Sequence, residues 1–303
     1  MRYNVCAVVV TYNPDIAVFA DVIAKLDEQV NQIIIVDNHS NNCSDIEAVA
    51  QQSSCRFVST SENMGIAHAQ NLGVAYGIEQ NAQYILFMDQ DTILPDGAVD
   101  DLYDMCRDLE AKGVRVGSIG HAYRDTHDGK VSIAARAQGH RLIRRAATPD
   151  TDTLLEADFI IASGSLIPIP ALREVGLMDE TLFIDLVDVE WGLRARSRGY
   201  RNFQSLRKIM THTLGNGRIN LFGKSISLHT PIRDYYVIRN SILMLGRDYV
   251  GLAWKLYFFR RLFPFFIVFG FFANHKMARL HFMTRGLIDG VLNRGGRYGQ
   301  RPA

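Results

Sequence analysis

The N-terminal third of the chain contains four short, mainly apolar runs that are rich in β-branched residues, and polar or acidic residues follow each of them. Segments with helical spacing separate several of these runs. The runs are Val5–Val10, Gln32–Val36, Cys55–Val58 and Tyr84–Met88, and the clearest helical segments are Ile16–Gln29 and Ile66–Glu79. This order predicts an α/β fold with a Rossmann-like, doubly wound and mostly parallel sheet. Because such sheets bind ligands at the carboxyl ends of their strands, the residues after each run are candidates for a site.

The most informative of these strand ends is Asp89-Gln90-Asp91, which directly follows the Tyr84–Met88 run and precedes a turn at Leu94–Gly97. A strand end holds two carboxylates rigidly, and the loop after it leaves them open to a ligand. Divalent cations bind carboxylate oxygens and often keep phosphate oxygens as further ligands. An acidic pair beside a turn is, on its own, more often a pair of solvated turn residues. The hypothesis of a metal–diphosphate site therefore depends on the rest of the chain.

Two further strand ends suggest a nucleotide cleft. Thr11 and Tyr12 end the first run, and Asp37 ends the second. Neighbouring parallel strands would bring these residues to one rim, where Asp37 can accept a hydrogen bond from a base or a ribose and Tyr12 can stack on a base. The alternative for Asp37 is a helix cap or an Asx-turn.

The segment Glu62–Gly73 opens a helix with small residues. A helix N-terminus favours anions, and Asn63 and Gly65 would let a phosphate approach closely. Ala69 and Gly73 would allow tight packing of this helix on the sheet. Packing alone would also explain the segment.

Three carboxylates lie within six residues at the start of a predicted helix, Asp188–Gly199. They are Asp185, Asp188 and Glu190, and Arg194 follows four residues after Glu190. The simpler interpretation is favourable helix-dipole chemistry with an i,i+4 ion pair. The functional one is a partly buried general base with a supporting ion pair.

The middle of the chain is less regular. Val116–Gly120 and Phe159–Ala162 are predicted strands, whereas His121–Asp150 is polar and basic and is predicted to be a loop or excursion. His212 precedes a glycine-containing segment. A lone histidine is more often structural, but the metal bound by Asp91 would otherwise lack a nitrogen ligand from the protein.

The C-terminal region differs from the rest in charge. Residues 246–303 contain ten Lys and Arg but two acidic residues, so that this part carries +8 and the remainder −7 of the net +1. The run Leu262–Ala273 is uncharged and apolar, but Arg260, Arg261 and Pro264 argue against a spanning helix. Aromatic residues flanked by cations favour a helix in the membrane interface, and the alternative is a buried core or dimer helix. We therefore divide the chain into residues 1–240 and a basic, aromatic, helical region, residues 241–303.

Taken together and in order, the motifs resemble family 2 glycosyltransferases of the GT-A fold over about residues 3–240. The motifs are Val8–Asn13, Val36-Asp37-Asn38, Asn63-Met64-Gly65, Asp89-Gln90-Asp91, Asp188-Val189-Glu190-Trp191 and His212. The Asp-Gln-Asp form, the block Phe183–Arg194 and the segment Asp234–Asn240 are most similar to bacterial rhamnosyltransferases. Those enzymes build O-antigen, a part of lipopolysaccharide, and related cell-wall polysaccharides from dTDP-L-rhamnose.

The resemblance implies a role for each matching residue. Asp188 would be the catalytic base with Glu190 beside it, although Val187 replaces the first carboxylate of the family's Glu-Asp motif, so the choice among Asp185, Asp188 and Glu190 stays open. Asp91 and His212 would hold Mg²⁺ or Mn²⁺. The nucleotide-sugar donor would be bound by Thr11, Tyr12, Asp37, Asn63, Gly65, Asn71, Asp89 and Gln90, with Asp37 at the base and Asp89 at the ribose. The acceptor would contact Asp185, Trp191 and Arg239.

The resemblance also implies an inverting transfer to a lipid-pyrophosphate-linked saccharide at the cytoplasmic face of the bacterial inner membrane, with the protein attached peripherally. The four cysteines, Cys6, Cys43, Cys55 and Cys106, show no metal or disulfide spacing and favour a reducing compartment, and Val5–Val10 is no signal peptide. Alternatives are a nucleotidyltransferase, a transferase for another nucleotide sugar such as a UDP-hexose, and a membrane-attached scaffold without activity. Nucleic acid is not an expected partner, because the positive charge lies beside a phenylalanine-rich run.

Overall fold

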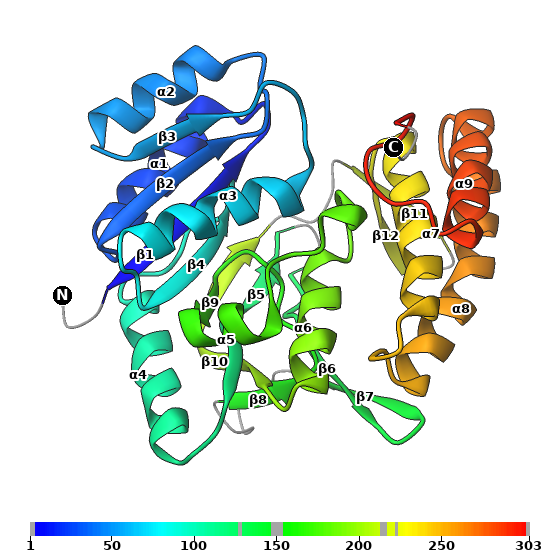
Figure 1. Ribbon diagram of the computed structural model, residues 1–303. Helices are drawn as coiled ribbons and strands as arrows, with labels where there is room; N and C mark the ends of the chain where they lie inside the picture. The colour runs from blue at the N-terminus through cyan, green and yellow to red at the C-terminus, as the bar shows by residue number, and fades with distance from the viewer. Residues whose placement is uncertain (1–3, 127–128, 147–153, 213–216, 222–223, 301–303) are drawn as a thin grey trace.

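The computed structural model describes residues 4–126, 129–146, 154–212, 217–221 and 224–300. Its main sheet consists of β1 (Val5–Thr11), β2 (Gln32–Asp37), β3 (Arg56–Ser59), β4 (Tyr84–Asp89), β5 (Val116–Asp125), β8 (Leu154–Ala157), β9 (Ser165–Pro168) and β10 (Arg201–His212). The strand order is β3-β2-β1-β4-β9-β5-β10-β8 (Figure 1). Strands β8 and β9 run against the direction that the other six share. The fold is therefore mixed α/β with a large, mostly parallel sheet.

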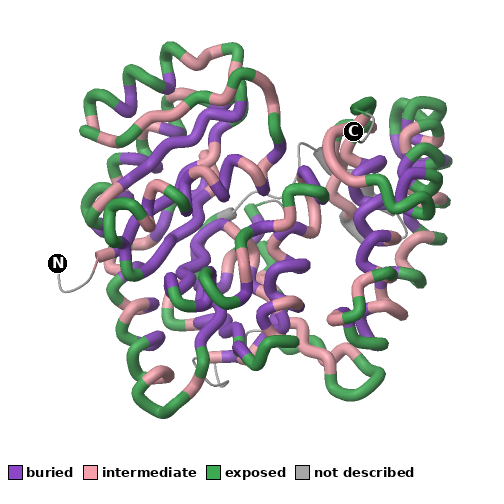
Figure 2. The backbone as a smooth tube through the Cα atoms, viewed as in Figure 1, coloured by how far each residue is buried: buried purple, intermediate pink, exposed green. Residues whose placement is uncertain are grey.

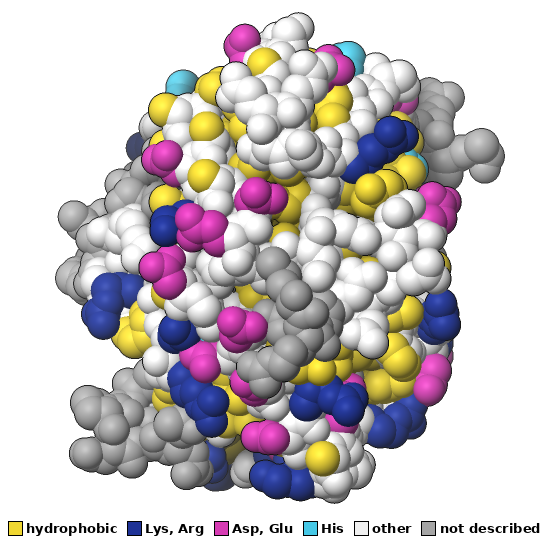
Figure 3. All heavy atoms as spheres, turned by 90° about the vertical axis from the view of Figure 1, so that its left-hand side faces the viewer, with side chains coloured by type: hydrophobic (Ala, Val, Ile, Leu, Met, Phe, Trp, Pro, Cys, Tyr) yellow, Lys and Arg dark blue, Asp and Glu magenta, His cyan; other side chains and the backbone are white. Residues whose placement is uncertain are grey.

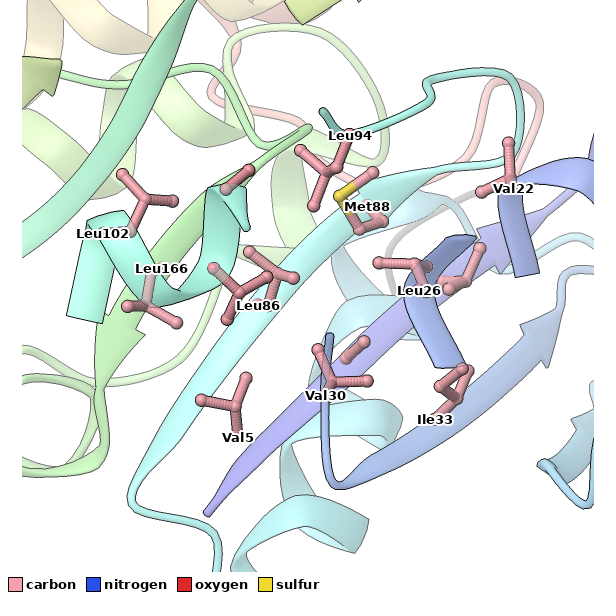
Figure 4. Packing of buried hydrophobic residues seen from close by; sticks show 14 of the residues in the cluster. Val5, Val22, Leu26, Val30, Ile33, Leu86, Met88, Leu94, Leu102 and Leu166 are labelled. Carbon is pink, nitrogen blue, oxygen red and sulfur yellow. The ribbon is translucent and has the colours of Figure 1, made fainter. Parts of the chain in front are cut away.

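Helices cover both faces of this sheet, because successive side chains of a strand point to opposite faces. Val5, Ala7 and Val9 of β1 belong to one buried cluster, and Cys6 and Val8 belong to another. Figure 4 shows part of the first cluster, in which strand side chains pack against helical leucines and valines. The helices are α1 (Ile16–Asp27), α2 (Cys43–Gln52), α3 (Ile66–Glu79), α4 (Ala98–Ala111), α5 (Ile169–Val175) and α6 (Val187–Ser197).

Local chemistry explains where one of these helices begins and how closely another packs on the sheet. Asp15 caps α1, since its carboxylate accepts hydrogen bonds from the amides of Ala17 and Val18. On α3, a Cβ atom at Gly73 would lie 2.2 Å from a Val8 methyl group, so only glycine permits this approach. The expected tight packing of α3 on the sheet is confirmed.

Two predictions for the middle of the chain are wrong. Phe159–Ala162 is not a strand: β8 ends before it and β9 begins after it, and the segment instead packs Phe159 and Ile160 into two apolar clusters. His121–Asp150 is not mainly a loop, because β5 continues to Asp125 and is followed by a hairpin of β6 (Ile133–Gln138) and β7 (Arg141–Ala146). The exposed positions of β6 and β7 carry basic side chains, so the sequence did not show the alternation of apolar and polar residues that is typical of a strand. Residues 147–153 lie outside the described part.

The C-terminal region is helical, as expected. Its first helix, α7 (Pro231–Gly246), begins before residue 241, and α8 (Leu252–Ile267), a π-helical turn η2 (Val268–Phe272) and α9 (Lys276–Val291) follow. A second hairpin of β11 (Gly217–Leu221) and β12 (Lys224–Leu228) precedes α7. These helices stand beside the sheet, away from the N-terminus (Figure 1). Among the described residues, each helix is too short or too polar to cross a bilayer.

The three C-terminal helices have their own interior, in which Asp234 of α7 and Arg279 of α9 form a buried ion pair with a 2.6 Å contact. Each helix also has exposed parts, seen as green segments in Figure 2. On the opposite, N-terminal side of the molecule, basic and acidic side chains are interspersed (Figure 3). The boundary at residue 240 stays a prediction.

Candidate active site

The carboxyl ends of β1, β2 and β4 meet at one edge of the sheet. Thr11 lies opposite Asp37, and Val10 lies opposite Asp89, in the parallel register of these strands. Three strand ends that are far apart in sequence therefore form one rim, as predicted from their polar residues.

Asp37 is fully buried at this rim and is held by protein groups. Its carboxylate accepts hydrogen bonds from the Thr11 hydroxyl at 2.9 Å, from the Ser40 amide at 2.9 Å and hydroxyl at 2.5 Å, and from the Ser59 hydroxyl at 3.3 Å. These contacts fix the loop after β2 against β1. Thr11 and Asp37 thus support the rim from beneath its surface.

Gln90 ties the loop after β4 to the loop after β1. Its side-chain oxygen accepts a hydrogen bond from the Tyr12 amide at 2.7 Å, and its side-chain nitrogen donates one to the Tyr12 carbonyl at 3.3 Å. The Tyr12 ring is left half exposed, at 51%. Gln90 thus fixes the Tyr12 backbone and leaves the ring accessible, and its stacking on a nucleobase stays a prediction.

The turn before α3 is closed by protein rather than left open. Asn38 donates to Asn63 at 3.0 Å and accepts from the Met64 amide at 2.8 Å, and Asn63 in turn accepts from the Gly65 amide at 3.0 Å. Gly65 has φ +88°, and a Cβ atom there would lie 2.6 Å from Phe183. The small residue that was expected to make room for a phosphate makes room for the Phe183 loop.

Asp188 lies in the first turn of α6, half-buried and close to Asp89. Burial raises the pKa of Asp188 to about 6; the charge of Asp89 adds to the increase, and a hydrogen bond from the Val189 amide opposes it. Asp188 also lines a small cavity of about 20 Å³ with Trp191 and Gln70. A carboxylate with a pKa of about 6 is charged at neutral pH and yet basic enough to take a proton.

The two neighbouring carboxylates have partners of their own. Glu190 is 1% exposed and forms an ion pair with Arg194, and it also accepts a hydrogen bond from the Tyr249 hydroxyl at 2.5 Å. Asp185 forms a two-point ion pair with Arg233, with contacts of 2.5 and 3.2 Å. Among the three acids, this geometry favours Asp188 as the base.

Three other predicted residues lie in the interior around the segment between α5 and α6, residues 176–186, which we call the catalytic loop. The amide of Asn71 donates to the Met178 carbonyl at 3.0 Å and accepts from the Met178 amide at 2.9 Å, and the Trp191 indole donates to the Gly176 carbonyl at 2.8 Å. Arg239 is fully buried, with its guanidinium on the Leu182 carbonyl at 2.8 Å. The three side chains position the loop, and the expected acceptor contacts of Trp191 and Arg239, which are both buried, stay a prediction.

The expected metal ligands come from segments that the fold brings together. Ile93, two residues after Asp91, pairs with Thr211, the residue before His212, through an isolated antiparallel bridge. Asp91 is exposed, and no partner of its carboxylate exists within the described residues. His212 ends β10, and only its backbone is described. Over the described ranges, no group of three or more His, Cys, Asp or Glu side chains forms a metal site.

Sequence reasoning missed two residues of this site. Asn240 donates hydrogen bonds to the carbonyls of Ile184 and Asp185, both at 2.8 Å, although it is 55 or more residues away in the chain. Arg233 pairs with Asp185, and although burial opposes it, the charges of Asp185 and Asp89 raise the pKa of Arg233. Both residues lie on or beside the Asp234–Asn240 segment that the sequence singled out, which was the available signal.

Comparisons with known proteins agree with this architecture. A family model described as "Glycosyl transferase family 2" matches residues 6–175. A Shigella flexneri protein named "dTDP-rhamnosyl transferase RfbF" is 31% identical over 257 residues, which cover 83% of each chain.

Solved structures with the same fold have lower sequence identity. S. aureus TarS 1-349 in complex with UDP-GlcNAc has a TM-score of 0.59 and 14% identity, over 95% of this chain and 81% of that one. GalNAc-T7 with UDP, GalNAc and Mn²⁺ has a TM-score of 0.55 and 14% identity, over 86% of this chain and 54% of that one. These similarities extend to the fold alone.

Proposed function

The chain belongs to glycosyl transferase family 2, and we propose that this glycosyltransferase moves L-rhamnose from dTDP-L-rhamnose to a saccharide carried on a lipid diphosphate. The donor sugar is inferred from the name of the Shigella flexneri relative and from the rhamnosyltransferase-like motifs. The lipid-linked acceptor is inferred from the basic, aromatic C-terminal region.

The observation that carries the proposal is the position of Asp188. It lies beside Asp89 at the rim formed by the strand ends, and burial raises the pKa of Asp188 to about 6. Glu190 and Asp185 are each engaged by an arginine, so Asp188 is the carboxylate that is left to act on an acceptor hydroxyl.

The proposed reaction is a single displacement. Asp188 takes the proton from the acceptor hydroxyl while that oxygen forms a bond to the anomeric carbon of the sugar. The bond from this carbon to the nucleoside diphosphate breaks on the opposite face, so that the configuration inverts. General-base assistance of this kind contributes about 10²–10⁴ in rate.

The carboxylate of Asp91, which is exposed and has no partner among the residues that the structure describes, fits a divalent cation, since Mg²⁺ and Mn²⁺ are commonly held by one or two carboxylates together with substrate phosphates. His212 follows the residue that bridges to Ile93 and is the proposed nitrogen ligand. A cation bound there would neutralise charge on the departing diphosphate. Tyr12 and Gln90 would hold the base end of the donor.

We also place the protein at the cytoplasmic face of the inner membrane, attached peripherally. Phe259 and Phe263 lie four residues apart on α8 and are 66% and 74% exposed, and Arg260 beside them is also exposed. Exposed aromatic residues beside cations suit the interface of an anionic bilayer.

The test is to compare Asp188→Asn with the parent protein, using dTDP-L-rhamnose and a UDP-hexose as alternative donors. We expect transfer from dTDP-L-rhamnose, with turnover in the variant lower by about 10²–10⁴ and the donor dissociation constant little changed. Transfer from the UDP-hexose alone would reject rhamnose. Normal turnover of Asp188→Asn would reject the mechanism, and an absence of both transfer and donor hydrolysis in the parent would favour a scaffold.

A further inference from the structure

A second cavity, of about 140 Å³, lies between the β6–β7 hairpin and helices α6 and α8. Its lining includes four aromatic side chains and two arginines: Phe159, Trp254, Tyr257, Phe258, Arg144 and Arg261. A water molecule takes up about 30 Å³ in the liquid. The cavity is therefore large enough for a phosphate group or a sugar ring but too small for an oligosaccharide.

This cavity is next to the proposed base. Leu186 and Val189 line it, and they lie two residues before and one residue after Asp188. Asp188 itself lines the smaller cavity with Trp191. The first turn of α6 thus separates the two spaces, and a molecule bound in the larger one would lie on the other side of this turn from the Asp188 side chain.

The walls of the cavity are fixed by one buried carboxylate. Asp158 is 1% exposed and accepts hydrogen bonds from the Trp254 indole at 2.6 Å and from the Ala137 amide at 2.7 Å. It also forms an ion pair with Arg196 of α6. A single side chain therefore links α8, β6 and α6, so the cavity is formed before any ligand binds.

The two arginines of the cavity lie over aromatic rings. Arg144 lies over the Tyr257 ring at 5.5 Å, and Arg261 lies over the Phe265 ring at 5.9 Å. Within the part of the chain that the structure describes, neither guanidinium pairs with an acidic residue. Two unpaired guanidinium groups at the edge of an aromatic cavity suit a phosphate with an apolar attachment, because arginine binds phosphate oxygens through paired N–H groups.

We propose that this cavity binds a phosphate group of the lipid-linked acceptor's diphosphate, with Arg144 and Arg261 on the phosphate oxygens and the rings of Tyr257 and Trp254 against the apolar attachment. The proposal rests on the proposed function, because it names the binding site for that acceptor. The lipid chain would leave along α8, where Phe259 and Phe263 are exposed. Acceptors would then be selected by their diphosphate as well as by their sugar.

The test uses Arg144→Ala and Arg261→Ala in the full chain, with Arg145→Ala on β7 and Lys255→Ala on α8 as matched controls. Each control removes one positive charge from the same element as a cavity variant, and neither control residue lines the cavity. For a lipid-diphosphate-linked acceptor, we expect KM to rise about tenfold or more in each cavity variant, as for the loss of a charged hydrogen bond. We expect KM to change less than twofold in the controls.

Three further measurements separate the possible causes. With a soluble acceptor that has the same sugar but no phosphate, KM should be equal in all variants, and donor hydrolysis should be unchanged. Binding to anionic phospholipid vesicles without acceptor should fall equally in cavity and control variants. Equal KM effects in cavity and control variants, or a selective loss of vesicle binding in the cavity variants, would overturn the proposal. If the parent protein itself does not hydrolyse the donor, the proposed function is rejected instead.

Discussion

One turn apart on α6, Glu190 and Arg194 form a two-point ion pair, with contacts of 2.7 Å and 2.9 Å between their side chains. The same guanidinium donates hydrogen bonds to the carbonyls of Val175 and Leu177, at 2.6 and 2.7 Å. The helix that carries the proposed base is thereby fixed to the end of α5. This ion pair explains why Glu190 lies so close to Asp188 in the chain and yet does not share its proposed role as the base.

We therefore expect Glu190→Gln to affect stability more than catalysis. Removing one partner of a buried pair leaves a buried charge, and the free energy of unfolding should fall by about 3 kcal/mol. Turnover per folded molecule should stay far above that of Asp188→Asn. Denaturant unfolding and active-site titration measure the two effects, and Glu47→Gln on the exposed face of α2 is the control, expected within about 0.5 kcal/mol of the parent.

Asp188 should lower the stability of the folded chain at neutral pH. Its pKa is about 6 in the folded protein, against an ordinary value of 3.8. Between these two values the folded state holds a proton that the unfolded state has released, so this contribution to stability decreases as pH rises from about 4 to 6 and stays at its lowest level above pH 6. At 1.4 kcal/mol per unit, the difference amounts to about 3 kcal/mol.

Asp188→Asn removes this titration. The variant should be more stable than the parent by about 2–3 kcal/mol at pH 7, and the two should become equal near pH 4. Activity of the parent should fall on the acid side of pH 6, since the base must be charged to accept a proton. Unfolding curves at pH 4 and 7 measure the first effect; a parent that is equal to or more stable than the variant at pH 7 would contradict it.

The sequence predicted the parallel half of the sheet because β1, β2 and β4 are apolar runs buried on both faces, as in Val5–Val10. It did not predict β9, whose four residues end in Pro168 and run antiparallel between β4 and β5. The apolar run Phe159–Ala162 looked like a better strand, but its side chains fill gaps between elements. Periodicity cannot separate these two cases, because only the tertiary contacts differ.

The same limit applies to the site. Residues at strand ends, such as Tyr12 and Asp89, were found because topology brings strand ends together. The partners of Asn71 and Arg239 are backbone carbonyls and amides in a distant loop, with no signature in side-chain type or spacing. A motif thus identified the important residues in these segments but did not distinguish ligand contact from support of the loop.

Gly65 offers a direct test of how α3 is joined to the catalytic loop. A Cβ atom there would meet Phe183 at 2.6 Å, whereas at Gly113, which also has positive φ, it would meet nothing within 4 Å. Gly113→Ala should lower the free energy of unfolding by about 1 kcal/mol through backbone strain alone. Gly65→Ala should lose roughly a further 1–3 kcal/mol, from the clash with Phe183 and from a backbone conformation (φ 88°, ψ 159°) that is nearly restricted to glycine, and it should also lower turnover. Equal losses in the two variants would mean that the Phe183 contact is unimportant.

Asp91 should contribute to donor binding and not to the stability of the fold. Its carboxylate is exposed, and Asp91→Asn should leave the free energy of unfolding within about 0.5 kcal/mol of the parent. In the presence of Mn²⁺, the variant should bind dTDP-L-rhamnose about tenfold or more weakly, since a charged ligand of the cation is lost. A chelator should weaken donor binding by the parent to the level of the variant and have little effect on the variant itself. If the chelator does not change the donor affinity of the parent, a cation at this position is contradicted.

The exposed phenylalanines of α8 should bind the membrane. Fully burying such a side chain contributes about 1.5–3 kcal/mol, so even partial insertion of two should change vesicle affinity at least tenfold. The double variant Phe259→Ser and Phe263→Ser should therefore lose affinity for anionic vesicles while its unfolding curve stays the same, because both side chains already face solvent. Ile133→Ser on the β6–β7 hairpin, which is 52% exposed, is the matched control and should bind vesicles like the parent. Raised salt should weaken binding of all variants through the arginines beside the phenylalanines, and undiminished binding of the double variant would place the contact with lipid elsewhere on the molecule.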